Sequence, residues 1–189
     1  MRDLVVKYLT ENHSHVYGRE KRFSNHCNKV SEGNIPTSDI NIKQSTANLL
    51  SVTDVLEKVG VKYSVVFGTL LGIYRDGNLI KHDKDSDLAV WLEDPDKFIE
   101  TIKALEGIEL KVTRFTSCLV SFTRGGDYID LYLFANRKPT DGKLHCITMY
   151  GTLTPMDFDG SNTINFGGKD LVCVNNPEEY FQKIYGSDW

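Results

Sequence analysis

The chain has 189 residues, of which 40% are hydrophobic and 25% are charged, and its formal net charge is −4. This composition is typical of one globular domain with an ordinary core. The acidic balance, with a pI of about 5.7, argues against a general nucleic-acid-binding protein. No run approaches the roughly 18 apolar residues of a membrane span, and the short apolar run at the start is not typical of a secretory signal.

The cysteines are scattered and show no paired spacing: Cys27, Cys118, Cys146 and Cys173. This pattern favours reduced thiols over a disulfide framework, so the predicted location is the cytoplasm. Three histidines precede or adjoin the first cysteine: His13, His15 and His26. Their spacing matches none of the usual pairs of zinc ligands, so no zinc site is predicted there.

Apolar residues recur at helical spacing in several stretches, which predict helices over residues 1–12, 42–59, 95–105 and 177–185. Gly60 is expected to end the second helix, and Asp94 to cap the third. Residues 13–39 are polar and rich in Gly, Asn and Ser, which indicates loop or extended structure. We therefore divide the chain into an N-terminal helix with an irregular segment, residues 1–40, and a main domain, residues 41–189.

Extended apolar runs predict strands over residues 61–67, 88–92, 109–115, 118–123 and 128–134, with a weaker candidate at 143–150. The segment Arg124-Gly125-Gly126-Asp127 between two of them is typical of a hairpin turn. Residues 154–169 are rich in turn formers. The predicted fold class is α+β: a mixed sheet flanked by helices in a single domain.

An acidic segment opens the second predicted strand, where Asp83, Asp85 and Asp87 alternate with other residues. Side chains two residues apart on a strand share a face, so these carboxylates are expected at one edge. They repel one another unless a cation lies between them, and Mg²⁺ prefers such oxygen ligands. The alternative is a solvated acidic turn.

A fourth carboxylate, Asp130, projects from the middle of an apolar and aromatic strand, YIDLYLF. A buried carboxylate is costly unless it is paired or bound to a metal. We expect it to share one or two ions with Asp85 and Asp87, and the alternative is a salt bridge to a buried Arg or Lys. Three carboxylates around two divalent ions are typical of phosphoryl or nucleotidyl transfer.

Gly68 and Thr69 lie between a strand and a helical turn, where glycine allows close approach to a phosphate and the helix start donates N–H groups. Both are predicted substrate-binding residues. Arg75, at the end of the turn, is either a phosphate ligand or a surface ion-pair partner. His82 flanks the acidic segment and is a candidate for a phosphate contact.

The stretch GTLLGIYRDGNLIKHDKDSDLAVW resembles the signature of the LicD and fukutin-related-protein group, within the DNA polymerase β-type nucleotidyltransferase superfamily. In that group a Gly-Thr/Ser-Leu-Leu-Gly-x-x-Arg segment precedes a His/Trp-Asp-x-Asp-x-Asp segment. The strand around Asp130 and the closing sequence FGGKDLVCVNNPEEYFQKIYGSDW are similar to later parts of the same pattern. The resemblance covers about residues 42–189.

The resemblance implies an enzyme that transfers a phospho-alcohol, such as phosphocholine or ribitol phosphate, from a CDP-activated donor to a glycan hydroxyl. Mg²⁺, with Mn²⁺ as a substitute, would be held by Asp85, Asp87 and Asp130, and Asp83 would be a further ligand or a base. Within the same fold, a nucleotidyltransferase that uses an NTP to modify a small molecule or protein remains open. A catalytically silent binding domain and a structural scaffold are further alternatives.

Overall fold

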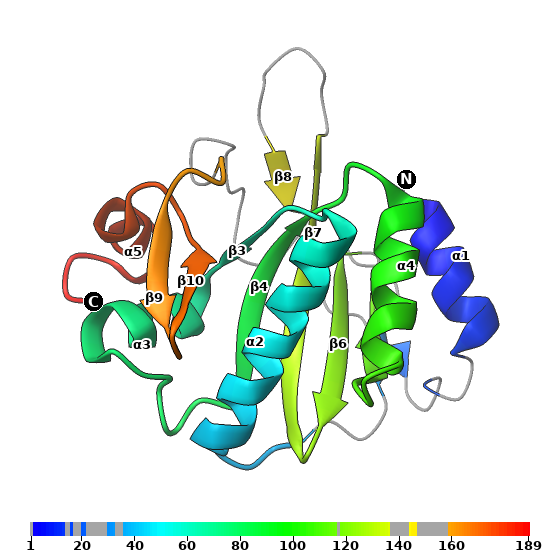
Figure 1. Ribbon diagram of the computed structural model, residues 1–189, viewed down its shortest axis with the longest axis horizontal. Helices are drawn as coiled ribbons and strands as arrows, with labels where there is room; N and C mark the ends of the chain where they lie inside the picture. Colours follow the sequence, from blue (N-terminus) through cyan, green and yellow to red (C-terminus); the bar gives the residue numbers. More distant parts are fainter. Residues whose placement is uncertain are drawn as a thin grey trace.

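The computed structural model describes residues 2–13, 16, 20–21, 30–32, 36–116, 118–136, 144–146 and 159–189. Its helices are α1 (Arg2–Asn12), α2 (Ile42–Val59), α3 (Phe67–Asp76), α4 (Pro95–Glu106) and α5 (Pro177–Tyr185) (Figure 1). Its first strands are β1 (Glu20–Lys21), β2 (Val30–Glu32), β3 (Tyr63–Val65), β4 (Asp85–Trp91) and β5 (Lys111–Phe115). The later strands are β6 (Leu119–Arg124), β7 (Asp127–Asn136), β8 (Leu144–Cys146), β9 (Thr163–Phe166) and β10 (Lys169–Val172).

The main sheet has the strand order β1-β2-β5-β6-β7-β4-β3, and β8 pairs with β7 outside this path. Strands β4 and β7 run parallel, whereas the other paired neighbours described in this sheet are antiparallel. The parallel pair requires a long connection, which α4, β5 and β6 supply. The predicted class, an α+β fold with a mixed sheet, is confirmed.

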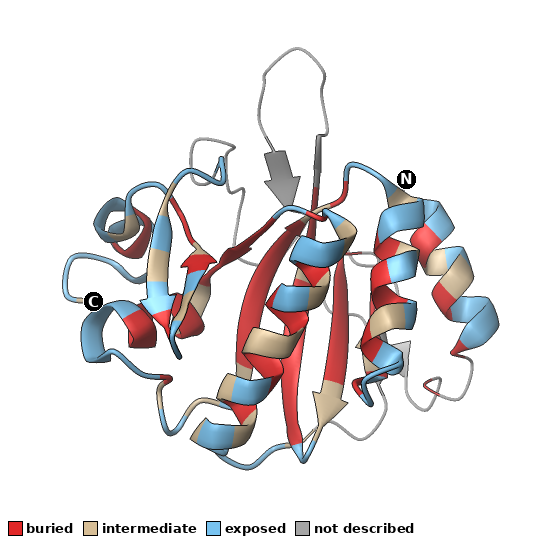
Figure 2. Cartoon of the chain, in the orientation of Figure 1, coloured by how far each residue is buried: buried red, intermediate tan, exposed pale blue. Residues whose placement is uncertain are grey.

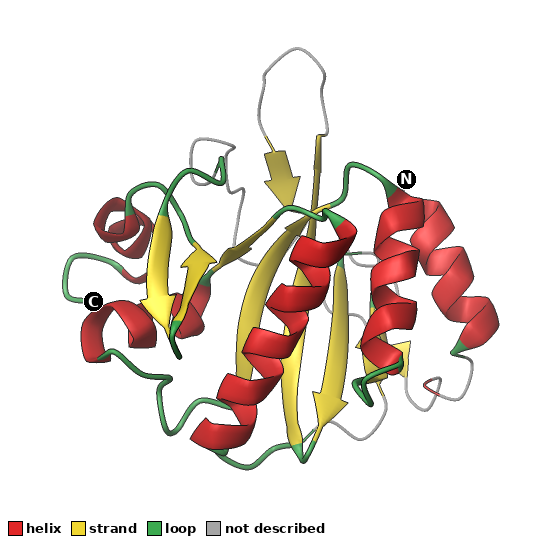
Figure 3. Cartoon of the chain, viewed as in Figure 1, coloured by secondary structure: helices red, strands yellow, loops and turns green. Residues whose placement is uncertain are grey.

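Helices α2 and α4 lie side by side across one face of the sheet, and α1 packs on α4 (Figure 3). The buried residues lie on the sheet-facing sides of these helices and along the central strands (Figure 2). In α2 the apolar stripe includes Leu49, Val52 and Leu56, all with no exposed surface. The side chain of Asn41 accepts a hydrogen bond from the Gln44 N–H, and this cap begins the helix.

The hairpin between β6 and β7 is fixed against α2. Gly125 and Gly126 have φ of 65° and 89°, values that glycine adopts without steric cost. The side-chain amide of Asn48 donates to the carbonyl of Arg124 at 3.0 Å, and the guanidinium of Arg124 donates back to Asn48 at 2.9 Å. The predicted hairpin is therefore confirmed, and it sets the register of β7.

Two parts of the chain carry more regular structure than the sequence patterns predict. The turn-rich stretch before residue 169 contains β9, which pairs with β10 in a small antiparallel hairpin. An isolated parallel bridge between Val65 and Cys173 joins this C-terminal part to β3. In the N-terminal segment, β1 and β2 extend the main sheet through β5. The division of the chain at residue 40 stays a prediction.

The prediction of reduced cysteines is wrong for Cys118, which forms a disulfide, and is confirmed for Cys173, a buried free thiol. Disulfides are rare in the cytosol, so Cys118 gives no support to a cytoplasmic location. That location stays a prediction. His15, His26 and Cys27 lie outside the described residues. Among the helices described, none is both long and apolar enough to cross a membrane.

Helix α3 packs closely on the chain that leads from it to β4. A Cβ atom added to Gly72 would lie 2.6 Å from the carbonyl oxygen of Asn78 and 2.9 Å from Cγ1 of Ile80. After the helix, Gly77 reverses the chain with a φ of 66°. This close contact places the start of β4 beside the start of α3.

We expect Gly72→Ala to destabilise the protein by roughly 1–3 kcal/mol, because the added methyl group would lie 2.6 Å from a backbone oxygen, and backbone yields less easily than the end of a side chain. Helix propensity alone predicts the opposite sign, a gain of about 1 kcal/mol. Urea unfolding measures the change, with Lys58→Ala on the exposed side of α2 as a control. A Gly72→Ala protein as stable as the wild type would show that the segment at Asn78 yields.

Candidate metal centre and active site

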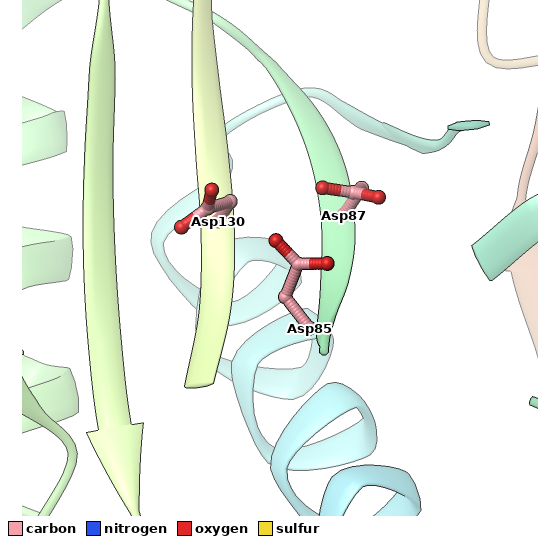
Figure 4. A group of neighbouring side chains, drawn as sticks. All are labelled: Asp85, Asp87 and Asp130. Carbon is pink, nitrogen blue, oxygen red and sulfur yellow. The ribbon is translucent and has the colours of Figure 1, made fainter. Parts of the chain in front are cut away.

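Three carboxylates converge where β4 and β7 run side by side. The register of this parallel pair sets Asp87 opposite Asp130 and Asp85 opposite Tyr128. Asp85, Asp87 and Asp130 each offer a ligand oxygen, and these atoms lie within 4.8 Å of one another. Figure 4 shows the three side chains on the same side of the two strands. We call them the triad.

The triad lies on the face of the sheet that α2 does not cover. Asp127 faces α2, because its carboxylate accepts a hydrogen bond from the Asn41 N–H at 3.0 Å. Asp130 is three residues further along the same strand, so it projects from the opposite face. The sheet thus separates the apolar core under α2 from the acidic site.

Burial and mutual repulsion set the electrostatics of the triad. Asp87 and Asp130 are 7% and 1% exposed, and Asp85 is half-buried. Burial, followed by the charges of Asp130 and Asp83, raises the pKa of Asp85 to about 7. Burial and the neighbouring carboxylates raise the pKa of Asp87 well above its ordinary value. Burial likewise raises the pKa of Asp130, although Arg114 and Ser121 oppose the shift.

The triad is hydrogen-bonded to three neighbouring side chains. The guanidinium of Arg114 forms an ion pair with Oδ2 of Asp130, and the hydroxyl of Ser121 donates to Oδ1. Tyr128 hydrogen-bonds to Asp85. The salt bridge expected as the alternative for Asp130 is therefore present, and it coexists with the carboxylate cluster.

The triad opens into a cleft of about 610 Å³ between the sheet, α3 and α5. Two of its carboxylates, Asp85 and Asp87, line this cleft. Gly68, His82 and Asp83, which the sequence singles out, also line it. The remaining lining residues are apolar or aromatic: Phe67, Leu71, Ile80, Tyr132, Ile184 and Tyr185. The cleft thus has an acidic floor and an apolar wall.

The start of α3 is held directly against the triad. The hydroxyl oxygen of Thr69 accepts a hydrogen bond from the Asp87 N–H at 2.8 Å, and Thr69 is 2% exposed. A Cβ atom on Gly68 would lie 2.5 Å from Oδ2 of Asp83. Glycine at this position therefore allows the Asp83 carboxylate to approach the helix start, and Thr69 fixes the strand that carries Asp87.

Phe67 begins α3 with a φ of 51°, a left-handed conformation that is rare for a bulky residue. Its N–H donates to the hydroxyl of Tyr180 in α5 at 3.1 Å, and its ring packs edge-on against Tyr132 at 5.1 Å. Such strained backbone costs of order 1–3 kcal/mol and persists only where the surroundings hold it. The neighbouring helix α5 thus helps to set the conformation of the helix start beside the triad.

Arg75 lies apart from the other predicted site residues. It is exposed at the end of α3, and its guanidinium donates to the Asp76 carboxylate at 2.8 and 3.0 Å. Of the two roles predicted for Arg75, phosphate ligand or surface ion-pair partner, the structure shows the ion pair. Its role toward a substrate stays a prediction.

The sequence interpretation missed Arg114, Ser121 and the wall formed by α5. Tyr128 and Tyr132 carried a signal, because they alternate with Asp130 and so share its face of β7. Arg114 carried little signal, since a charged residue in a short strand is usually an exposed edge residue. Its contact with Asp130 depends on strand pairing, which is a long-range property.

A family model for the LicD/FKTN/FKRP nucleotidyltransferase domain matches residues 60–163, which include β3, α3, β4 and the whole triad. The chain belongs to this family. It is therefore a transferase domain of the nucleotidyltransferase fold, and the family implies a nucleotide-type donor. A search of curated protein sequences found no match.

Solved structures of the antibiotic-resistance factor ANT(2'')-Ia share the fold. Its solution structure has 11% sequence identity and a TM-score of 0.55, with 79% of this chain and 78% of that chain covered. Its crystal structure in complex with adenylyl-2''-tobramycin has 11% identity and a TM-score of 0.54, with 77% and 81% covered. At this identity the similarity shows the fold alone.

The donor set of this LicD-family site fits a hard divalent cation. Oxygen ligands from three converging carboxylates are what Mg²⁺ and related ions prefer. A cation between them would offset the repulsion that adds to burial in raising the pKa values of Asp85 and Asp87. The triad is thus consistent with divalent-metal binding.

The pH dependence of stability tests the raised pKa of Asp85, which burial and the neighbouring carboxylates cause together. In the fold the pKa of Asp85 is about 7, above its ordinary 3.8, so the folded state binds more protons than the unfolded state between these values. Without metal, this contribution to stability is full below about pH 4 and is lost as the pH rises towards about pH 7. Asp85→Asn does not ionise and loses this dependence.

We therefore expect metal-free wild-type protein to lose more thermal stability than Asp85→Asn between about pH 5 and about pH 8. Thermal unfolding in a chelating buffer measures both profiles. Asp96→Asn, an exposed change on α4, is the matched control and should follow the wild type. Parallel profiles for wild type and Asp85→Asn would contradict the raised pKa of Asp85.

Gly68→Ala tests the close approach of Asp83. The new methyl group meets a side-chain oxygen that is able to move, so we expect a smaller loss of stability than for Gly72→Ala, within about 1 kcal/mol. The displaced carboxylate changes the cleft, so ligand binding there should weaken by about tenfold or more. Urea unfolding and titration with a nucleotide measure the two effects. Unchanged binding would show that Asp83 has no part in the site.

Proposed function

We propose that this LicD-family protein is a Mg²⁺-dependent phosphotransferase that moves a phospho-alcohol, such as phosphocholine or ribitol phosphate, from a CDP-activated donor to a glycan hydroxyl. The observation that carries the proposal is the triad: three carboxylate ligand atoms within 4.8 Å, beside a helix start, in a matched LicD-family domain. The cleft offers about 610 Å³ for the reacting groups.

Asp85, Asp87 and Asp130 would hold one or two Mg²⁺ ions, for which Mn²⁺ would substitute. Ions held there would offset the negative charge of the donor diphosphate and the charge that develops as it is attacked. Asp83, which lines the same cleft, would be a further ligand or a base. One of these carboxylates accepts the proton of the incoming hydroxyl as it attacks in line, and CMP leaves.

The residues at the start of α3 would position the donor. Backbone N–H groups at a helix N-terminus favour a phosphate, and Gly68 lets it approach closely. His82 lines the same cleft and would contact the phosphate. Thr69 would act through Asp87, whose N–H its hydroxyl accepts. Phe67, Tyr132 and the α5 side chains would exclude water from the opposite wall.

A second candidate is nucleotidyl transfer from an NTP to a small molecule or protein. It is favoured by the shared fold with ANT(2'')-Ia, whose crystal structure holds adenylyl-2''-tobramycin. The two reactions differ in the phosphorus atom attacked. Phospho-alcohol transfer releases CMP, whereas nucleotidyl transfer releases pyrophosphate.

The released product decides between them. With Mg²⁺ present, we expect a CDP-alcohol such as CDP-choline or CDP-ribitol to raise the melting temperature, and to yield CMP once a glycan acceptor is added. Asp87→Asn should lower turnover by roughly a hundredfold or more, because it removes a carboxylate ligand of the ion that offsets negative charge in the transition state. Asp96→Asn should match the wild type. If instead CTP or ATP releases pyrophosphate in the presence of an acceptor and no CDP-alcohol releases CMP, the second candidate is supported.

A further inference from the structure

Four polar residues form a row across four neighbouring strands. Arg114 of β5 pairs with Ser121 of β6, Ser121 pairs with Asp130 of β7, and Asp130 pairs with Asp87 of β4. Directly opposed residues in a sheet have neighbouring side chains on one face. The row therefore leads from a cation at one end to the triad at the other.

Arg114 is held firmly in this row. The register of β5 against β6 shifts between Val112 and Arg114, so the strand has an irregularity directly before this residue. The side chain is 11% exposed, and its guanidinium lies 5.7 Å from the centre of the Tyr128 ring. Its Nε donates to the hydroxyl of Ser121 at 2.9 Å. A planar guanidinium suits this arrangement, because it binds two partners in a fixed geometry.

Both oxygens of Asp130 are engaged by this row. Oδ2 pairs with Arg114 and Oδ1 accepts from Ser121, which itself accepts from Arg114. The positive charge of Arg114 also lies close to the rest of the triad, since Asp130 is directly opposite Asp87 and the ligand atoms of the three carboxylates lie within 4.8 Å of one another. One guanidinium thus places a fixed positive charge beside the whole triad.

We propose that Arg114 is a positioning residue that serves as the built-in counter-charge of the triad: it supports the folded site before an ion binds, and it limits how tightly the site binds a divalent cation. The inference rests on the metal dependence of the proposed function and not on the identity of donor or acceptor. A fixed positive charge beside a cation site repels the incoming ion. Free protein would then bind the ion weakly, and ion and diphosphate would bind together.

Arg114→Met tests both halves of the inference. Without the guanidinium, the metal-free protein should melt lower by roughly 4 °C or more, because a buried carboxylate loses its partner. At the same time the nucleotide-free protein should bind Mn²⁺ about tenfold more tightly, because the repelling charge is gone. Calorimetric titration with Mn²⁺ and thermal unfolding in a chelating buffer measure these changes without any transfer reaction.

Two further variants separate charge from structure. Arg114→Lys keeps the charge but not the fork, so Mn²⁺ affinity should stay near the wild-type value while melting falls. Arg124→Met removes a guanidinium that bonds to Asn48 on the α2 side, so it should lower melting without tightening Mn²⁺ binding. If Arg114→Met does not fold, Arg114→Gln retains a donor without the charge and carries the same expectation.

The inference fails if Arg114→Met or Arg114→Gln binds Mn²⁺ no more tightly than the wild type, since a residue with a purely structural role would weaken the site when removed. If Arg114→Met binds Mn²⁺ more tightly but the wild-type protein releases neither CMP nor pyrophosphate, the counter-charge is supported and the proposed function is overturned. If the wild-type protein turns over but the Arg114 variants bind Mn²⁺ with unchanged affinity, the proposed function is supported and the counter-charge is overturned.

Discussion

The parallel pairing of β4 with β7 is the constraint on which the site depends. Its register sets Asp87 opposite Asp130 and keeps Asp85 on the same face. A slip of one residue would turn Ser86 and Leu88 to the cleft and would bury the carboxylates against α2. The hairpin that Asn48 and Arg124 fix against α2 holds one partner of this pair in place, because it anchors the start of β7. The core therefore defines the site although the triad lies outside it.

Much of this arrangement is predictable from local sequence patterns. The helix over residues 42–59 follows from its apolar stripe, and the structure gives α2 the same bounds. Alternation along the strands places Asp85 with Asp87, and Asp130 between two tyrosines, on single faces. Because an unpaired buried carboxylate is costly, the sequence also indicates that the strands carrying Asp85, Asp87 and Asp130 lie close together around a shared cation.

The remaining features depend on contacts between residues far apart in the chain. Arg114 reaches Asp130 through the pairing of three strands, which no local pattern predicts. The left-handed φ of Phe67 is equally unpredictable from its neighbours, because a bulky residue would be expected to avoid it. The hairpin of β9 and β10 lies in a stretch whose turn formers outweigh its short apolar runs. Strand and helix propensities depend on residues nearby in the sequence, whereas these features depend on contacts made across the whole fold.

Helix α5 joins stability to the site. Tyr180, 2% exposed, accepts the N–H of Phe67 and so supports the strained start of α3. One turn further on, Ile184 and Tyr185 form part of the wall of the cleft. Helix α5 thus holds Phe67, the residue before Gly68, and also lines the cleft in which the triad would bind its ligand. A ligand that packs on this wall would be coupled to the backbone that presents Gly68 and Thr69, since both effects act through one short helix.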